Sequence, residues 1–446
     1  MAGRIQLETT SLQDKYLTDD PEFTYFIKNF KKHDNYSKFY KDLDLNGNIE
    51  FGELVKCTIP QDQGDLLKGV SLKMTLEPSP PPSPENSIYC ESIGQAIIEY
   101  ADIIIGGTLI HRVPSDMIMI HSELNVTQSQ HKSLRRLVGK PELSYSYYND
   151  YYKLVRSALT AESLTKTKYR VDIPFYFHDH PELAIPMYAI TKQEIEIHIK
   201  LRSAKECIFT NVNTSLDIAE TYYLGVEPKG LISDMKVCLE LVTLDKKPKM
   251  DKPIDYIITQ TQQNTFELDV ANEYVNSTLK CNEHVAHLSF KNNVKEMFFV
   301  VKDKFNNNPS VANDFSTPFQ YSASALFDTY GFFTNSEQVK YISLNFDGEQ
   351  VLNEITGDMV HLRAIQPGKH HSRTPIYRRF YSYSFALEPE RWYPTGQLNF
   401  SVIKNQVLKI GLFDYPLTAD KQLRVYAQSY NILRLENGTV KLLFNT

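Results

Sequence analysis

The chain contains few cysteines, and their arrangement excludes a disulfide framework. Its 446 residues include five cysteines, an odd number, at Cys57, Cys90, Cys207, Cys238 and Cys281. Secreted domains that depend on disulfides carry an even number of cysteines at close spacing. We therefore expect free thiols and a reducing compartment for this chain.

Long apolar runs and an excess of positive charge are also missing. The longest apolar stretches, Ile97–Ile110 and Met297–Val301, are too short to cross a bilayer, and the first residues show no signal-peptide pattern. The formal net charge is -6, whereas proteins whose main task is to grip nucleic acid present a basic face. We therefore expect neither a membrane span nor direct binding of nucleic acid.

Motifs of common enzyme classes are absent from the sequence. There is no Walker loop, no Gly-x-Ser-x-Gly nucleophile elbow and no His-Glu-x-x-His zinc motif. The pair His178 and His180 resembles the metal pair of cupins. However, Ala184 stands where cupins need a glutamate, and Asp172 stands where they need a glycine. We expect a polar loop there.

Two further groups hold atoms that could bind a ligand. Cys281, His284 and His287 could supply zinc ligands, but residues three apart on a strand point to opposite faces. His370 and His371 lie beside basic residues in a loop bounded by glycine and proline, where we expect a solvated loop rather than an anion site. The sequence thus predicts no catalytic, cofactor-binding or metal-binding residue, no cofactor and no enzymatic activity.

The segment Asp42–Glu53 has the residue spacing of an EF-hand calcium loop, with oxygen ligands offered by Asp42, Asp44, Asn46 and Glu53. An EF-hand also needs a helix on either side of the loop. The residues that follow, Leu-Val-Lys-Cys-Thr-Ile-Pro, are rich in β-branched side chains and end in proline, which favours a strand. We interpret the segment as a turn that leads into a strand, with calcium binding as the open alternative.

Aromatic residues and period-two patterns dominate the rest of the sequence. The chain has 28 Tyr and 24 Phe, and aromatic side chains favour strands over helices. Charged and apolar residues alternate strictly over Glu194–Leu201, which is typical of a half-buried strand. The pairs Gly106-Gly107 and Asp347-Gly348 predict tight turns. Two successive series of short strands, in a chain long enough for two domains, indicate two antiparallel β-sandwiches or barrels.

One stretch near the C-terminal end resembles a known family. It contains Phe385-Ala-Leu-Glu-Pro-Glu390, Pro394-Thr-Gly396 and Asn399-Phe-Ser401. These motifs resemble the late strand pair of the major capsid proteins of nucleocytoplasmic large DNA viruses, of the iridovirus and chlorovirus type. The apolar alternation through Leu387, and again from Leu398, predicts two half-buried strands joined by a turn-rich loop.

Further segments resemble the same family and occur in the order in which the family has them. They are Leu12–Phe26, Ile105–Ile110, Leu183–Ile190, Lys291–Val300 and Arg424–Gly438. The chain departs from the family pattern at Asp20, where the family has glycine, and at Asn292 with Asn293, where it has His-Pro. Each motif is degenerate, and the number and order of the motifs give the resemblance its specificity.

The resemblance implies an all-β chain. It predicts two consecutive eight-stranded antiparallel jelly rolls, with short helices in the loops. The limits that we expect are residues 1–25 for an N-terminal arm, 26–207 for the first jelly roll, 208–232 for a linker and 233–446 for the second jelly roll.

The resemblance also implies a function. It predicts a structural major capsid protein that forms homotrimers of pseudo-hexagonal outline and tiles an icosahedral virion shell, assembled in the host cytoplasm. The expected partners are its own copies, neighbouring capsomers and minor capsid proteins, with an internal virion membrane nearby that the chain does not span. Loops Pro78–Ser87 and Phe305–Phe315 are expected to face outward or to link neighbours. The alternative is a carbohydrate-binding β-sandwich surface protein, because the aromatic segment Tyr145–Tyr152 suits sugar stacking.

Overall fold

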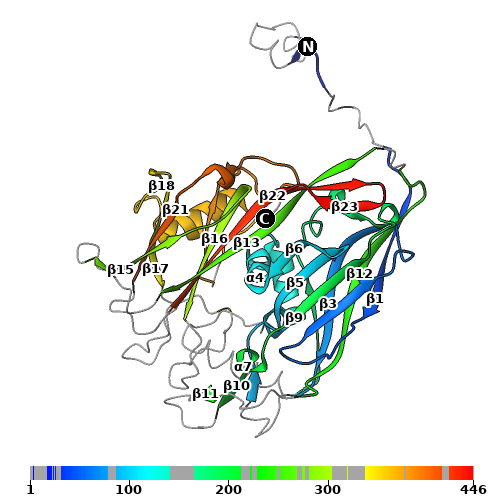
Figure 1. The fold of residues 1–446 in the computed structure, drawn as a ribbon, viewed down its shortest axis with the longest axis horizontal. Helices are drawn as coiled ribbons and strands as arrows, with labels where there is room; N and C mark the ends of the chain where they lie inside the picture. Colours follow the sequence, from blue (N-terminus) through cyan, green and yellow to red (C-terminus); the bar gives the residue numbers. More distant parts are fainter. Residues whose placement is uncertain are drawn as a thin grey trace.

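The structure is a computed structural model of the chain (Figure 1). It describes residues 4, 18–22, 24, 26, 32–78, 87–140, 165–211, 221–222, 229–248, 252–268, 274–276, 281–303, 319, 337–375, 378–413 and 421–444. Most of the expected N-terminal arm, the proline-rich segment 79–86, the aromatic segment 145–152 and the loop 305–315 lie outside the described residues.

Two antiparallel sheets that face each other form the first sandwich. Sheet 1 has the order β1-β12-β3-β7, with β8 beside β3, and these strands span Tyr36–Asp44, Ile232–Leu244, Leu66–Leu76, Thr167–Asp172 and Ile185–Pro186. Sheet 2 has the order β2-β9-β5-β6, with strands Leu54–Ile59, Ile195–Leu201, Ile98–Ile105 and Thr108–Pro114. The inward side chains of both sheets form one apolar core. In β9 every second residue is buried, which confirms the predicted half-buried strand.

Short elements fill the connections of the first sandwich. A small sheet of order β11-β10-β4 consists of Thr221–Tyr222, Ile208–Asn211 and Ser87–Tyr89. The helices are α3 (Ile93–Ala96), α4 (Ser115–Leu124), α5 (Gln128–Val138), η2 (Pro181–Leu183), η3 (Met187–Ala189) and α7 (Ala204–Cys207). Helix α4 is rich in Met and Ile and is buried on nearly all sides.

Two more antiparallel sheets form the second sandwich. Sheet 3 has the order β13-β22-β16-β19, with β20 beside β16 and β23 beside β22; these strands span Ile254–Leu268, Lys421–Glu436, Asn293–Asp303, Tyr381–Ser384, Leu398–Asn399 and Thr439–Leu442. Sheet 4 has the order β14-β15-β21-β17-β18, with strands Tyr274–Asn276, Cys281–His287, Gln406–Leu412, Val339–Phe346 and Glu349–Leu352. The helical turns are η5 (His361–Ile365), α8 (Gln366–His370) and η6 (Phe400–Val402). The predicted all-β architecture of two sandwiches with short helices in the loops is confirmed.

Strand β12 belongs to the first sandwich. It pairs with β1 from Tyr36 opposite Leu244 to Asp44 opposite Lys236, and it pairs with β3 along its other edge. The expected start of the second jelly roll at residue 233 does not agree with this pairing, because the chain leaves the first sandwich only after Leu244. An apolar alternation identifies a strand, but it does not identify the sheet that the strand joins.

Two-residue turns connect three of the hairpins. Gly106-Gly107 joins β5 to β6, Asp347-Gly348 joins β17 to β18, and Asn437-Gly438 joins β22 to β23. All six residues have positive φ angles between 51° and 93°. Glycine and Asn or Asp tolerate this region, and such turns match the twist of the paired strands. The first two turns were predicted from the sequence and are confirmed.

The stretch Tyr383–Ser401 runs strand, loop, strand as predicted, because β19 and β20 both pair with β16. The strand ends earlier than its alternation suggests, at Ser384. Leu387, expected to be half-buried, is 75% exposed. Phe385 still packs inward, with its ring centroid 5.8 Å from that of Phe400.

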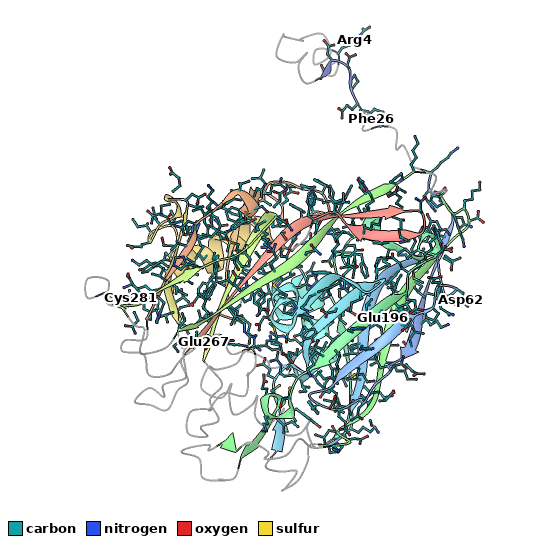
Figure 2. The ribbon with its side chains drawn as sticks, in the orientation of Figure 1. Arg4, Phe26, Asp62, Glu196, Glu267 and Cys281 are labelled. Atoms are coloured by element: carbon teal, nitrogen blue, oxygen red, sulfur yellow. The ribbon has the colours of Figure 1, made fainter. Side chains whose placement is uncertain are left out.

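Strands β16 and β22, at the centre of sheet 3, are buried on both faces, whereas exposed side chains remain on the edge strand β13. On β16, Met297, Phe299 and Val301 point into the core of the second sandwich, whereas Phe298 and Val300 join the core of the first. Period-two alternation disappears when both faces are buried, which explains the continuous apolar run noted in the sequence. Figure 1 shows α4 and β6 beside sheet 3, and Figure 2 shows side chains filling the space between the two sandwiches.

Gly357 lies against the backbone of β17, where a side chain has no room. A Cβ added at Gly357 would lie 1.7 Å from the carbonyl oxygen of Ile342. The amide of Ile342 donates a hydrogen bond to the carbonyl of Gly357 at 2.9 Å, so neither segment can move away without losing it. We predict that Gly357→Ala lowers the free energy of unfolding by about 3 kcal/mol, measured by urea unfolding.

Gly368 provides the matched control for this substitution. A Cβ added there would meet only a methyl group of Thr374, at 3.4 Å. Because Gly368 lies in α8, Gly368→Ala should leave the stability unchanged or raise it by up to about 1 kcal/mol. Equal losses in the two variants would show that the close approach of Gly357 is unimportant.

Candidate functional site

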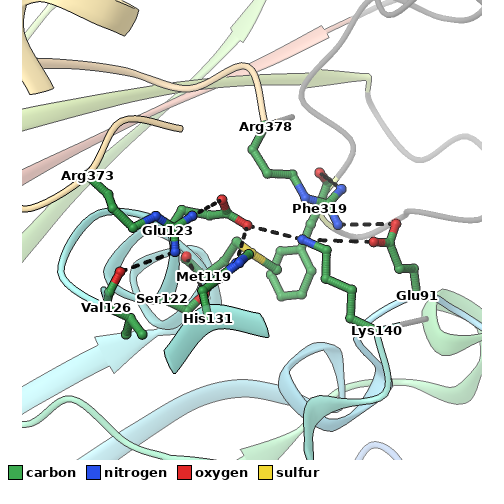
Figure 3. A network of polar contacts seen from close by, with 10 residues as sticks. All are labelled: Glu91, Met119, Ser122, Glu123, Val126, His131, Lys140, Phe319, Arg373 and Arg378. Carbon is green, nitrogen blue, oxygen red and sulfur yellow. Dashed lines mark hydrogen bonds and ion pairs between the residues drawn. The ribbon is translucent and has the colours of Figure 1, made fainter. Parts of the chain in front are cut away.

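Buried charged side chains gather where the two sandwiches meet, and Glu123 is at their centre (Figure 3). Glu123 lies in the last turn of α4, with 1% of its side chain exposed. Its carboxylate oxygens are 3.1 Å from Nζ of Lys140, 3.4 Å from Nε2 of His131 and 3.4 Å from Nη2 of Arg373. Burial alone would raise the pKa of Glu123, but Lys140 and His131 hold it well below its usual range. The carboxylate is therefore ionised.

Arg378 extends this network to Glu91, which lies between β4 and α3. Its Nη2 is 3.4 Å from Oε2 of Glu91, and its Nη1 donates to the carbonyl of Phe319 at 3.0 Å. Nζ of Lys140 lies 4.0 Å from Glu91 and links the two carboxylates. Two arginines of the second half, Arg373 and Arg378, thus enter an acidic site made by the first half (Figure 3).

Asp116 makes a second polar contact between the halves, from the first turn of α4. Its Oδ2 is 3.1 Å from Nη1 of Arg424 and accepts a hydrogen bond from the hydroxyl of Tyr426 at 2.6 Å. Lys302 lies close to both Asp116 and Arg424. Burial lowers the pKa of Lys302 to about 8, although the charge of Asp116 opposes this shift. Asp116 is 1% exposed, so these groups replace the water that it loses on burial.

The edges of sheets 2 and 3 are also joined by hydrogen bonds. The side chain of Gln260 on β13 donates to the carbonyl of Ile110 on β6 at 2.6 Å. Nε2 of His111 lies 3.3 Å from the hydroxyl of Thr261. The junction therefore combines an apolar interior with polar contacts that are specific in direction.

His371 is buried, so the expectation of a solvated loop is wrong for this residue. Its side chain is 3% exposed and lies 3.0 Å from Glu296 and 3.3 Å from Glu390. Burial lowers the pKa of His371, but Glu296 and then Glu390 outweigh it and raise the pKa to about 9. The neighbouring His370 donates from Nδ1 to the carbonyl of Leu387 at 2.9 Å.

The pair His178 and His180 lies near the His371 site, because His180 lines the same cavity as Glu296 and Glu390. Oδ2 of Asp179 lies 2.7 Å from Nε2 of His121. Oδ1 of the same carboxylate lies 3.9 Å from Nε2 of the neighbouring His178. Cys281 and His284 are buried on β15, whereas His287 is exposed, which confirms the strand. In the described part of the chain, no group of three or more His, Cys, Asp or Glu side chains is placed to hold a metal ion.

The segment with EF-hand spacing begins on a strand rather than in a loop between helices. Asp42 and Asp44 lie on β1, where their carboxylates are 2.7 Å from Lys73 and 3.2 Å from Lys236. The following residues turn into β2, which confirms a turn that leads into a strand. The two aspartates are paired with lysines of β3 and β12.

Glu123, Asp116 and the arginines that meet them were not predicted from the sequence. Glu123 and Arg373 are 250 positions apart in the sequence, so no local spacing relates them. One signal was present: the segment Ser115–Leu124 contains the apolar run Met117–Ile120 and yet carries two acidic residues. Charges on a helix that is buried on nearly all sides must find partners within the protein.

We predict that Glu123→Gln destabilises the chain strongly. The substitution keeps the shape of the side chain but leaves Lys140 and Arg373 buried without their negative partner. Breaking a buried ion pair by removing one charge costs about 3–5 kcal/mol. Urea unfolding measures the change. Glu388→Gln is the matched control, because the Glu388–Arg391 pair is more than half exposed and should contribute less than about 1 kcal/mol. Similar losses in both variants would count against the network.

His371 should make stability fall as the solution becomes alkaline. Its folded pKa of about 9 lies above the usual histidine value of about 6.5, so its contribution is complete below pH 6.5 and is lost as the pH rises through 9. The full contribution is about 3 kcal/mol. Other groups titrate in the same range, so the stability of the wild type is compared with that of His371→Gln between pH 6 and 10. A constant difference between the two would contradict the assignment.

Comparison with known proteins shows the family of this chain. Residues 24–245 match the family described as "Major capsid protein N-terminus", and residues 249–440 match "Large eukaryotic DNA virus major capsid protein". The matches meet just after the end of β12. Similar proteins include the major capsid proteins of Phaeocystis pouchetii virus, 24% identical with 99% of both chains covered, and of Paramecium bursaria Chlorella virus 1, 22% identical with 98% of both chains covered.

Solved structures share the fold along almost the whole chain. The quasi-atomic PBCV-1 virus capsid gives a TM-score of 0.69 at 19% identity, covering 95% of this chain and 100% of that chain. The Faustovirus major capsid protein gives a TM-score of 0.67 at 12% identity, covering 96% and 94%. The two pairs of sheets are therefore a double jelly roll.

The family matches and the structural matches each cover both sandwiches. In the described part of the chain no helix is both long and apolar enough to cross a bilayer. The chain belongs to the major capsid proteins of large eukaryotic DNA viruses, a structural and not an enzymatic family that forms the capsid shell of the virion.

Proposed function

We propose that this chain forms homotrimers of pseudo-hexagonal outline and that these trimers tile an icosahedral shell. The observation that carries the proposal is the burial of β16 and β22, the central strands of sheet 3, on both faces, which holds the two sandwiches of one copy side by side. Closed cyclic symmetry is the usual arrangement of homo-oligomers. Three copies around one axis would present six similar sandwiches, and hence a block with nearly sixfold outline.

The segment that follows β19 offers apolar side chains for the contact between copies. Leu387 is 75% exposed, Trp392 and Tyr393 are 43% and 42% exposed, and Val402 is 70% exposed. Aromatic and apolar side chains are enriched at the centres of subunit interfaces. Exposed groups of this kind on a structural protein support a role in self-association.

The further partners follow from the place of the protein in the shell. We infer contacts with neighbouring capsomers and with minor capsid proteins, an N-terminal arm over residues 1–25 on the inner side, and an internal membrane that the chain does not enter. Assembly takes place in the host cytoplasm, where the free cysteines agree with a reducing compartment. The net charge of -6 supports the absence of direct nucleic-acid binding.

The oligomeric state tests the proposal. Light scattering of the purified chain should give three times the mass of one 51.5 kDa copy. Leu387→Asp should weaken the trimer because it places a charge in an apolar contact, whereas Gln350→Asp, at an exposed polar side chain of the same sandwich, should leave the mass unchanged. A stable monomer for the wild type at micromolar concentration would contradict the proposal.

A further inference from the structure

Two buried cysteines stand opposite each other beside the small sheet. Cys90 directly follows β4, and Cys207 is the last residue of α7, directly before β10. Strands β4 and β10 are antiparallel, with Tyr89 opposite Ile208. The amide of Cys90 donates to the carbonyl of Cys207 at 2.9 Å, so the ladder continues by one further pair.

The geometry of this pair is compatible with a disulfide. Residues directly opposite in antiparallel strands have Cα atoms about 4.5–5.5 Å apart, within the range of about 4.4–6.8 Å found in disulfides. Cys90 also lies close enough to Cys207 to contribute to the raised pKa of its thiol. A bond between the sulfur atoms would therefore need little movement of the backbone.

The surroundings of Cys207 stabilise its protonated thiol in the folded protein. Its Sγ donates to the carbonyl of Ala96 at 3.8 Å, and Nε of Arg202 donates to the same oxygen at 2.9 Å. The guanidinium favours the thiolate form, but burial of Cys207 outweighs it and raises the pKa of the thiol. Exchange with an external disulfide therefore requires the three-residue strand β4 to open locally.

We propose that Cys90 and Cys207 form a reversible disulfide when the protein meets a low-molecular-weight disulfide oxidant such as oxidised glutathione. The thiolate of one cysteine attacks a sulfur of the oxidant and releases one reduced thiolate. The thiolate of the second cysteine then attacks the mixed disulfide, forms the bond between Cys90 and Cys207, and releases the second reduced thiolate. Each cysteine loses its proton to the solvent, and the two electrons reduce the oxidant.

The bond would add a covalent connection to the first sandwich. It joins the start of the chain segment 90–207 to its end, and this segment includes α4, α5 and much of sheet 2. Closing so long a loop restricts the unfolded chain and therefore stabilises the folded one. The disulfide would stabilise the fold of each copy once the protein leaves a reducing compartment. This effect does not depend on trimer formation.

The test compares the wild-type protein treated with oxidised glutathione and with dithiothreitol. After native treatment the remaining thiols are alkylated in denaturant, and the digest is analysed by mass spectrometry. We expect a peptide pair that links Cys90 to Cys207, with the loss of two hydrogens, and an unfolding temperature several degrees higher than that of the reduced protein. Cys90→Ser and Cys207→Ser should abolish both effects. Cys281→Ser, at a buried cysteine of the second sandwich, should retain both.

The peptide map of the wild type alone decides the proposal, even if a serine variant fails to fold. Five thiols that all remain alkylatable after oxidation would overturn it. So would a bond that links any other pair, or a glutathione adduct on a single cysteine without the internal bond.

Discussion

Strands β16 and β22, at the centre of sheet 3, have no face left for solvent, and the arrangement of the molecule depends on this constraint. One face contributes Met297 and Phe299 to the core of the second sandwich, and the other contributes Phe298, Val300 and Tyr426 to the core of the first. Full burial of such side chains is worth about 1.5–3 kcal/mol each. Separating the two sandwiches would expose them all on one side of the sheet, so the two jelly rolls behave as one body.

Apolar contact alone does not set the angle between two sandwiches, because it has little directional preference. The buried charges supply that direction. Glu123 must meet Lys140 and Arg373, and Asp116 must meet Arg424, for the junction to close without an unpaired charge. A capsid protein needs a fixed angle between its two sandwiches, because a small error in that angle would be repeated in every copy of the shell.

The sequence could predict what depends on neighbouring residues. The strands, the glycine turns and the strand pair around β19 and β20 were all visible as local patterns, and the family motifs gave the order of the sandwiches. The membership of β12, the burial of His371 and the partners of Glu123 could not be predicted. Each depends on residues far away in the sequence: β12 on β1 and β3, His371 on Glu296, and Glu123 on Arg373. An alternating pattern also cannot reveal the second buried face of sheet 3, because there the alternation is lost.

The most direct measurement of the central claim follows the unfolding of each sandwich separately in urea. The only tryptophan, Trp392, lies in the second sandwich, and its fluorescence reports on that half. Hydrogen exchange of the amides in β5 and β9 reports on the first half. If the shared sheet joins the halves into one body, the two probes should give coincident transitions. Two separate transitions, with one sandwich still protected while the other is unfolded, would contradict it.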